Sequence, residues 1–384
     1  MSRAVSTLYR AELIPASSPR WQEYFSAAPH DFFQTAEYHA LCAAAMQGEP
    51  LLLLYGTRDK FVAWPYVMQT IDQASRSTGE DAWRDATCVY GFSGPVSLNC
   101  EDDPAFLSEA FDAFLDVWRE QRMVSIFARF HPILMNHEWF RPDRTYGIRG
   151  ETQRTGATVY IDLSQAPSQI WDGYDRKLRQ SIRQVERAND YIALPDPNWE
   201  HLDEFIAIYH ATMKRNRVAP FLFFSRDYFL AFKEALGPHG SLYLGVRDGK
   251  IIAGFLLIEY KGIATVFLAG SDETLSRSAD NKFLFNQVQR FARSRGNKFL
   301  HFGGGRGGRD NDSLFAFKAQ FASTHPPFYT ARWILNPGVY ESLVDRRRTE
   351  AQRAGGQLPN SFFPAYRAPI SSPLEASETA KSTG

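Results

Sequence analysis

The sequence predicts an α/β protein in which one arrangement of strands and helices occurs twice. Two stretches, LLLLYGTRDKFVAWPYV at 51–67 and SLYLGVRDGKIIAGFLLI at 241–258, each read as two apolar strands joined by a short charged turn. After each of them come a further strand, an amphipathic helix and a closing strand. A pattern that repeats in this order is typical of internal duplication, so we expect two copies of one domain.

The length and composition fit two domains followed by a tail. With 384 residues, of which 44% are hydrophobic and 14% aromatic, the chain can bury two cores of ordinary size. We place the first domain at 1–150, the second at 151–345 and a tail at 346–384. The tail is expected to be partly disordered, because Ser, Pro and Thr dominate from Ser371 onward.

Charge and cysteine content exclude several classes of protein. The 43 basic and 43 acidic residues cancel, so no overall field recruits nucleic acid or an anionic membrane. Cys42, Cys88 and Cys100 lack metal-ligand spacing and are typical of buried thiols in a reducing compartment, so we expect no metal site. No apolar run approaches the ~18 residues of a membrane span, and the N-terminal stretch has no signal-peptide core. We therefore expect a cytoplasmic protein without an integral membrane segment.

The first half predicts a helix, the first hairpin, an irregular segment, a second helix and a strand. Phe32–Met46 has near-helical apolar spacing, and the hairpin follows it. Cys88–Val96 carries two glycines and a proline, which favour either a strained cleft wall or a simple bulge. Asp103 and Pro104 open the second helix as cap and first residue, and 124–130 is the next buried strand.

The second half predicts three helical stretches before its hairpin, at 169–188, 201–214 and 225–236. The hairpin itself contains Asp248 and Gly249, the pair that marks a tight two-residue turn. The elements predicted after the hairpin are a strand at 264–269, a helix at 280–295, a strand at 299–302 and a late helix beyond Tyr340.

The motif FLHFGGGRGGRDNDSLFAFKAQF at 299–321 joins the last predicted strand to an aromatic-rich element. Three consecutive glycines favour a backbone with positive φ or the close approach of another group: Gly303, Gly304 and Gly305. Lys318 is the single cation of the aromatic run and follows Phe317. Either its stem lies across apolar neighbours while its ammonium reaches water, or a partly desolvated ammonium faces developing negative charge.

Arginines on two predicted helices are candidates for binding anions. The helix at 169–188 carries a stripe at spacings of three and four: Arg176, Arg179, Arg183 and Arg187. A guanidinium group binds phosphate through two parallel hydrogen bonds, so the stripe is a candidate polyanion site; the other interpretation is a solvated helix face. Arg215 and Arg217 close the helix at 201–214, where cations also complement the helix dipole.

Three further candidates for substrate binding lie near the ends of predicted strands in the first half. Tyr90 is the polar side chain that we select within the irregular segment. Arg129 and His131 follow the strand at 124–130, a position where sites are common, although a lone histidine is more often a structural residue.

The absence of several catalytic motifs disfavours some classes of enzyme. The sequence has no Gly-x-Ser-x-Gly elbow, no His-Glu-x-x-His, no Walker loop and no paired-cysteine metal site. Hydrolases of those kinds, P-loop enzymes and zinc enzymes are therefore disfavoured.

The duplicated order of elements, together with FGGGRGGRDNDSLFAFKAQF near its end, resembles the Fem family of aminoacyltransferases. The resemblance covers about residues 32–340. Its other marks are YGFSGP at 90–95, RFHP at 129–132, KLRQSIRQVERA at 177–188 and YHATMKRNR at 209–217. The resemblance implies an α/β fold of two acetyltransferase-like (GNAT) domains in tandem.

Members of this family transfer an amino acid from its tRNA ester to an amine, in cell-wall bridges or in small natural products. By resemblance, Lys318 and Phe317 match the pair that holds the tRNA end and stabilises the transition state. Arg215 matches an arginine that binds phosphate or acidic groups of the acceptor. The resemblance implies charged tRNA as co-substrate and partner, no bound cofactor, and a small amine or cell-wall precursor as acceptor. The general base stays open between a carboxylate, His131 and the substrate itself.

Two departures from the family pattern bear on the substrates. The chain lacks the long helical-hairpin insertion of some cell-wall enzymes, which leaves the acceptor open. GNAT enzymes that use acetyl-CoA hold its pyrophosphate on a glycine-rich loop, whereas the corresponding GSDETLSRSADN at 270–281 has one glycine and three acids. Acetyl-CoA is thus disfavoured. The alternatives are an acetyl-CoA-dependent N-acetyltransferase, acting for example on a sugar amine, and a non-catalytic binding protein on the same scaffold.

Overall fold

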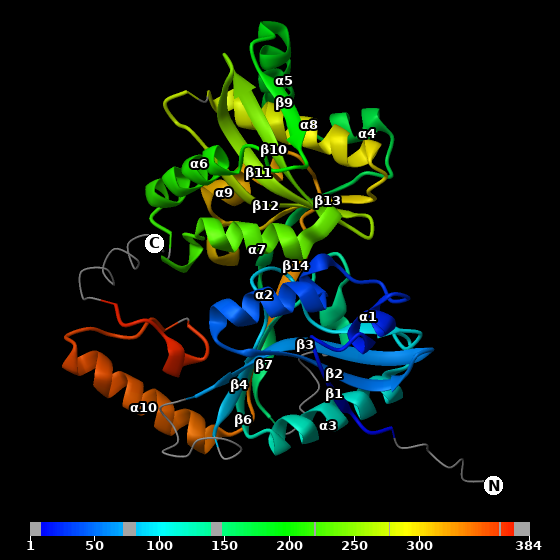
Figure 1. Ribbon diagram of the computed structural model, residues 1–384, viewed down its shortest axis with the longest axis vertical. Coiled ribbons are helices and arrows are strands. Elements are labelled where there is room, and N and C mark those ends of the chain that lie inside the picture. The colour runs from blue at the N-terminus through cyan, green and yellow to red at the C-terminus, as the bar shows by residue number, and fades with distance from the viewer. Residues whose placement is uncertain are drawn as a thin grey trace. The chain divides into compact units, whose positions relative to one another are not determined.

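The computed structural model describes residues 9–71, 82–139, 148–218, 220–275, 277–360 and 362–371. Two compact units make up the chain (Figure 1): unit 1 comprises Met1–Arg154 and Tyr329–Gly384, and unit 2 comprises Thr155–Phe328. The first boundary lies close to the predicted one at 150. The second prediction needs correction, because residues 329–345 belong to unit 1 and not to the second domain.

Unit 1 is built on a sheet in which the strands follow the order β1-β2-β3-β4-β6-β14-β7, with β5 paired to β3. Its strands are β1 (Glu12–Pro15), β2 (Glu49–Thr57), β3 (Lys60–Thr70), β4 (Arg84–Thr87), β5 (Val96–Leu98), β6 (Met123–Arg129), β7 (Arg149–Ala157) and β14 (Pro327–Ile334). The predicted hairpin is present as β2 and β3, and its register runs from Glu49↔Met68 to Thr57↔Lys60. Strand β14, which follows unit 2 in the chain, completes this sheet beside β6.

The helices of unit 1 are α1 (Arg20–Phe25), η1 (Phe32–Gln34), α2 (Ala36–Met46), α3 (Pro104–Glu120), η2 (Asn136–Trp139), α10 (Pro337–Arg353) and η6 (Ala365–Arg367). Helix α3 begins as predicted, with the Asp103 carboxylate accepting the amide of Phe106 and Pro104 in the first turn. The predicted helix Phe32–Met46 is divided at Thr35, whose extended backbone ends η1 and whose hydroxyl caps α2.

The C-terminal segment after α10 packs on unit 1, so the prediction of a separate tail from 346 onward is wrong for residues up to 371. Tyr366 is buried, and its hydroxyl lies 2.7 Å from the Ser125 Oγ and donates to Asp85. Arg367 also pairs with the buried Asp85 carboxylate, at 2.6 Å. The part of the tail predicted to be disordered lies, from 372 onward, outside the described residues.

Unit 2 has a six-stranded sheet of order β8-β13-β12-β11-β10-β9. Its strands are β8 (Val159–Asp162), β9 (Ile192–Asp196), β10 (Gly240–Arg247), β11 (Lys250–Tyr260), β12 (Ile263–Ser271) and β13 (Phe299–Gly303). Strands β12 and β13 run parallel, as do β4 and β6 of unit 1, and the other described pairs in both sheets are antiparallel. The two sheets therefore share one topology, which confirms the predicted fold of two GNAT-like domains.

The helices of unit 2 are α4 (Pro167–Asp172), α5 (Arg176–Ala188), α6 (Leu202–Arg215), η3 (Pro220–Leu222), α7 (Arg226–Leu236), η4 (Gly237–His239), α8 (Ser278–Ser294), η5 (Arg306–Gly308) and α9 (Ser313–Ala319). The single helix predicted at 169–188 is two helices, which corrects the prediction. Helix α4 ends at Gly173, and Asp175 caps α5 by accepting the amide of Lys177.

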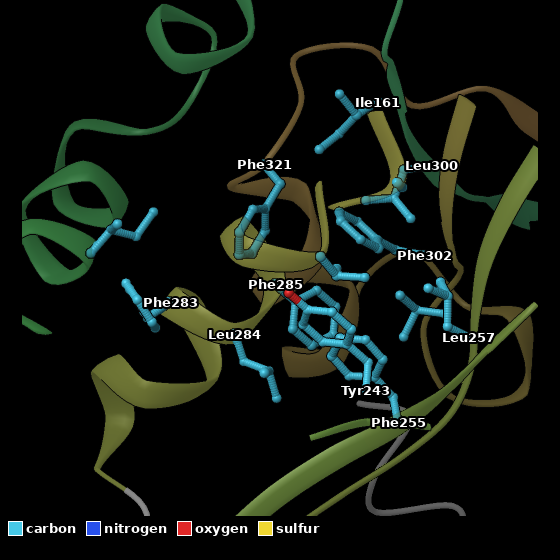
Figure 2. Close-up of a cluster of buried hydrophobic side chains, with 14 of the residues drawn as sticks. Ile161, Tyr243, Phe255, Leu257, Phe283, Leu284, Phe285, Leu300, Phe302 and Phe321 are labelled. Carbon is cyan, nitrogen blue, oxygen red and sulfur yellow. The ribbon is translucent and has the colours of Figure 1, made fainter. Parts of the chain in front are cut away.

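The core of unit 2 lies between its sheet and α8, and Figure 2 shows its aromatic centre. The Phe285 ring of α8 lies 5.4 Å from the Phe255 ring, 5.0 Å from that of Phe302 and 5.6 Å from that of Phe321, measured between ring centroids. Edge and tilted contacts of this kind fix ring positions closely. The end of β13 and the segment after α9 are thus held against the same helix.

Helix α6 covers the other face of the unit 2 sheet (Figure 1). A Cβ at Gly270 would lie 2.7 Å from the Cα of Tyr209, so only glycine allows this approach between β12 and α6. The C-terminal half of α6 consequently lies directly on the end of β12. Within the described residues, no helix is long and apolar enough to cross a membrane.

Candidate functional site

Strands β12 and β13 of unit 2 pair for only part of their length. Their parallel register runs from Ile263↔Phe299 to Thr265↔His301, whereas β12 continues along β11 as far as Ser271. The two strands therefore separate beyond Thr265. The glycine motif begins at this separation, because Gly303 is the last residue of β13.

The glycine motif forms a tight loop between β13 and α9. Gly303 has a φ of +70°, which a residue with a side chain adopts only at a cost. A Cβ at Gly305 would lie 2.5 Å from the Asp312 carboxylate. That carboxylate accepts the amide of Phe315 at 2.7 Å, which caps α9, and the amide of Arg306 at 2.5 Å. The predicted sequence of strand, glycine turn and aromatic element is thus present.

Lys318 lies on α9, with its ammonium bound to the glycine loop. Its Nζ donates to the carbonyl oxygen of Gly304 at 2.6 Å. The side chain is half-buried, and desolvation lowers the pKa of Lys318 to about 8, while the charge of Asp312 opposes that shift. The ammonium is thus held by the glycine loop and partly desolvated.

Phe317, the other predicted catalytic residue, packs into the core. Its ring lies 5.2 Å from that of Phe285 and 5.7 Å from that of Phe321. This packing fixes the position of α9 and hence of Lys318. Phe317 is therefore placed to orient Lys318.

The C-terminal end of α6 is bound to both separated strands. The Thr212 hydroxyl accepts the amide of Ser271 at 2.9 Å, at the end of β12. Arg306 of the glycine loop donates to the Asn216 side chain at 2.8 Å. Arg215 pairs with Glu273 at 2.8 Å and donates to the Ser271 carbonyl at 3.3 Å. Arg215 therefore lies at the end of β12 with its charge partly balanced.

Arg217 follows α6 in a left-handed conformation, with a φ of +49°, and its side chain is exposed. The link between Arg306 and Asn216 brings this end of α6 to the glycine loop. Sequence reasoning missed Arg306 and Asn216, and the only signal for Arg306 was its place within FGGGRGG.

Tyr90 and Arg129 lie together in unit 1, Tyr90 on the segment that follows β4 and Arg129 at the end of β6. Arg129 donates to the Gly91 carbonyl at 3.3 Å, and its own carbonyl accepts the amide of Ser93 at 2.9 Å. Burial raises the pKa of Tyr90, and the nearby charge of Arg129 opposes this shift. A parallel bridge between Ser93 and Phe130 ties the segment to the end of β6. In unit 1, the segment that follows β4 thus crosses the space beyond the ends of the parallel strands β4 and β6.

His131 is fully buried beneath this segment. Its Nδ1 accepts the amide of Leu134 at 3.2 Å, so the proton is on Nε2, which donates to the Asp31 carboxylate at 3.0 Å. Both ring nitrogens are occupied and neither reaches the surface. The structure therefore gives His131 a structural role, and we retain it neither as a substrate ligand nor as a candidate base.

The arginine stripe lies on α5 and is not uniform. Arg179 pairs with Asp172 at 3.2 Å, and the Arg183 guanidinium lies 5.5 Å from the centre of the Trp171 ring. Arg176 and Arg187 are exposed. Arg187 also donates to the backbone carbonyl of Arg183, at 3.1 Å. Three of the four predicted polyanion ligands thus have partners within the chain.

The loop at 270–281 uses its carboxylates within the chain. Asp272 accepts the amides of Thr274 at 2.8 Å and Leu275 at 3.3 Å, and hydrogen bonds from Thr274 hold the pKa of Asp272 below its usual value. Asp280 accepts the amide of Arg277 at 2.6 Å. A helix N-terminus is a natural anion site. The amide of Arg277, the N-cap of α8, and two amides of the loop before it are already bonded to carboxylates.

Asp280 is also half of a buried ion pair that the sequence did not reveal. Arg247 of β10 donates to both of its oxygens, at 2.6 and 2.7 Å. The Asp280 side chain is fully buried and that of Arg247 is 8% exposed. Among the described residues no group of histidines, cysteines and acids is arranged to hold a metal ion.

Comparisons with known proteins agree with this geometry. Residues 174–318 match the family model of the acetyltransferase (GNAT) domain. Among solved structures, the crystal structure of FemX is similar with a TM-score of 0.61 at 12% identity, and the match covers 86% of this chain and 99% of FemX. No curated protein matches the sequence.

Two further solved structures share the fold. L-PGS from Bacillus licheniformis has a TM-score of 0.51 at 14% identity, over 83% of this chain and 92% of that one. The C-terminal DUF2156 domain of a candidate lysylphosphatidylglycerol synthetase from Agrobacterium fabrum has a TM-score of 0.50 at 17% identity, over 77% and 86%. The match to the family model ends at Lys318, so it includes Gly303, Gly304, Gly305 and Lys318.

Proposed function

We propose that this chain, a GNAT-superfamily protein with the two-domain fold of Fem-type proteins, is an acyltransferase that moves an amino acid from aminoacyl-tRNA to an amine. The observation that carries this proposal is the Lys318 ammonium, which is partly desolvated and held 2.6 Å from the Gly304 carbonyl where β12 and β13 separate. The acceptor amine is that of a small metabolite or a cell-wall precursor.

The proposed reaction is a direct aminolysis. The acceptor nitrogen attacks the ester carbonyl carbon, a C–N bond forms, and the C–O bond to the ribose breaks. One proton of the amine passes to the departing ribose oxygen, so the products are an amide and an uncharged tRNA. A lysine ammonium has three donors, and one is used by Gly304, which leaves two for the oxyanion of the tetrahedral intermediate.

We assign the reaction to unit 2, because the corresponding region of unit 1 is filled. Ser93 bridges to Phe130, and Arg129 donates to Gly91, so the chain crosses the space beyond β4 and β6. Beyond Thr265 and His301 the strands of unit 2 separate and the glycine loop follows. We propose Arg215, Arg217 and Arg306 as ligands for the phosphate or acidic groups of the substrates, since guanidinium groups bind both.

The state of the loop at 270–281 supports an aminoacyl ester as donor in place of acetyl-CoA. A pyrophosphate needs free backbone amides in the loop that leads into α8, and those of Thr274, Leu275 and Arg277 are bonded to carboxylates. The obstacle is occupied amides more than repulsion, because Arg247 already balances the charge of Asp280. The acetyl-CoA-dependent N-acetyltransferase remains the second candidate, because the family model that matches is that of an acetyltransferase domain.

Incubation with charged tRNA or with acetyl-CoA, each with a panel of amines, tests the donor. We expect product from charged tRNA that ribonuclease treatment abolishes, and no specific heat on titration with millimolar coenzyme A. Product from acetyl-CoA alone would favour the second candidate. No product with either donor would favour a non-catalytic binding protein on this scaffold.

The pH profile of the reaction distinguishes two roles for Lys318. Because its pKa is about 8, the ammonium is lost as pH rises through that value. A cation that stabilises the oxyanion predicts that kcat/KM falls above pH 8, whereas a general base predicts that it rises. We expect the fall, and we expect Lys318→Arg, which stays charged, to lack it. A rise through pH 8 in the parent would assign Lys318 as the base.

The same pKa shift has a consequence for folding. The pKa of Lys318 is lower in the folded chain than its ordinary value of 10.5, so the unfolded chain binds the extra proton between about pH 8 and 10.5. Lys318 therefore opposes folding below pH 8, and this opposition is relieved as pH rises through that interval.

The exposed arginines of α5 provide a test of tRNA binding. Replacing Arg176 and Arg187 together with Gln should weaken binding of tRNA and reduce the slope of log Kd against log salt by about 1 to 2, if each contacts a phosphate. Fluorescence anisotropy over a range of salt concentrations measures this slope. The matched control replaces Arg58 and Arg119, two exposed arginines of unit 1. Equal slopes for both double variants and the parent would mean that the stripe is a solvated face.

A further inference from the structure

A cavity of about 520 Å³ in unit 2 is lined by residues of α4 and α8 and by none of those of the β12–β13 site. Figure 1 shows where these two helices lie. Trp171 and Tyr174 line it on the side of α4. Asn286, Gln289 and Arg293 line it from α8, at spacings of three and four that place them on one helix face. Its size falls in the range of about 300 to 1,000 Å³ that is usual for small-molecule sites.

Two buried polar groups at this cavity lack partners. Tyr174 is 3% exposed and Asn286 is 1% exposed. Across the described part of the chain, neither the Tyr174 hydroxyl nor the Asn286 Nδ2 has a hydrogen-bond partner. Buried polar groups without partners are rare in folded proteins because they are costly. Both residues line one cavity, so a ligand that accepts hydrogen bonds from these buried donors would satisfy them.

The cavity also contains a positive charge that the chain does not balance. Arg293 is half-buried, and its Nη1 donates to the backbone carbonyl oxygens of Leu163 and Gln165, which fixes the guanidinium. Its neighbours on α8 have carboxylate partners, since Arg290 pairs with Glu186 and Arg295 with Glu259. Within the described ranges, Arg293 has none, and no carboxylate lines the cavity. The charge of Arg293 and the lack of a carboxylate in the described lining favour a negatively charged ligand in this cavity.

Part of the remaining wall is aromatic, and Pro167, Arg290 and Ser294 complete it. The Trp171 and Tyr174 rings lie 5.7 Å apart between centroids, and the Arg183 guanidinium lies 5.5 Å from the Trp171 ring. A flat ring gains most from such a surface, because its whole face is removed from water.

We propose that this cavity binds a small aromatic carboxylate, an anion with one flat ring system. Its carboxylate accepts hydrogen bonds from Arg293 and from the Asn286 amide, and its ring lies against Trp171. The inference does not depend on the proposed transfer reaction, because no residue assigned to that reaction lines the cavity.

Three probes separate the parts of this recognition in calorimetric titrations of the full chain. 2-Naphthoate carries both ring and charge, 2-naphthamide has the ring without the charge, and acetate has the charge without the ring. We expect saturable binding of 2-naphthoate at submillimolar concentration, and binding about tenfold or more weaker for each of the other two, since each lacks one interaction. Equal affinity for 2-naphthoate and 2-naphthamide, or no binding of 2-naphthoate, would overturn the proposal.

Variants locate the ligand. Asn286→Leu removes an unpaired donor from the interior, so we expect an unchanged or higher Tm together with at least about tenfold weaker binding of 2-naphthoate. Arg293→Gln should also weaken it, while Arg295→Gln on the same helix, outside the cavity, should not. Lys318→Met should bind 2-naphthoate as the parent does. Parent affinity in both Asn286→Leu and Arg293→Gln, or loss of binding in Lys318→Met, would show that the anion binds elsewhere.

Discussion

Lys318→Met should reduce the rate of transfer at least ~100-fold, since one preorganised donor to an oxyanion is worth roughly 2.7 to 4 kcal/mol. Methionine keeps most of the volume of the side chain, although it is one atom shorter, and removes its charge. Phe317 and Phe321 hold α9 through ring contacts that the substitution leaves in place. The effect should therefore appear in kcat, with the substrate affinities little changed, because the interaction belongs to the transition state.

Folding provides the control for this variant. The ammonium is desolvated in the folded chain, so its removal should leave the free energy of unfolding unchanged or slightly higher, despite the lost bond to Gly304. Lys250→Met, at an exposed turn between β10 and β11, should keep full activity and is the matched substitution. A Lys318→Met protein as active as the parent would remove the lysine from the mechanism.

Local patterns in the sequence predicted most of the elements. The hairpins, α3 and α8 follow from alternating or helical apolar spacing together with a proline or a turn pair such as Asp248-Gly249, whose positive φ values of +49° and +71° fit a tight turn. The break between α4 and α5 was not predicted, because the apolar spacing continues across Gly173. Asp175 caps α5 only once the chain bends there, so its capping role could not be recognised from the sequence.

Long-range pairing was beyond the reach of such patterns. Strand β14 reads as the continuation of the second domain, yet it pairs with β6 of the first. The apolar residues of a strand do not indicate which sheet that strand will join. The same reason explains why Arg247 and Asp280 were missed as a pair, since they lie on different elements and meet only in the fold.

The part of the candidate site that lies within the motif at 299–321 could be predicted from the sequence. Lys318 and the glycines lie within twenty residues of each other, and the contact between Nζ and Gly304 follows from that motif. His131 was a weaker choice because its position after a strand does not reveal the buried Asp31 that binds it. Arg306 was missed because its partner Asn216 is far away in sequence.

Arg247→Met should lower the free energy of unfolding by about 3 to 5 kcal/mol, the usual cost of leaving a buried charge without its partner. Arg247 donates to both oxygens of the fully buried Asp280 and also to the Leu275 carbonyl at 3.2 Å. It therefore joins β10 to the start of α8 and to the loop before it. Without Arg247, the hydrogen bond that the described residues still give the Asp280 carboxylate is that from the Arg277 amide.

A second substitution identifies the cause of that loss. Adding Asp280→Asn to Arg247→Met removes the uncompensated charge, while the amide oxygen can still accept the Arg277 amide, so the double variant should be more stable than Arg247→Met alone. Urea unfolding of the parent and the variants measures the differences. Arg226→Met breaks the exposed pair with Asp203 and should change nothing measurable. If Arg247→Met unfolds like the parent, or if the double variant is no more stable than Arg247→Met, the ion pair does not anchor the start of α8.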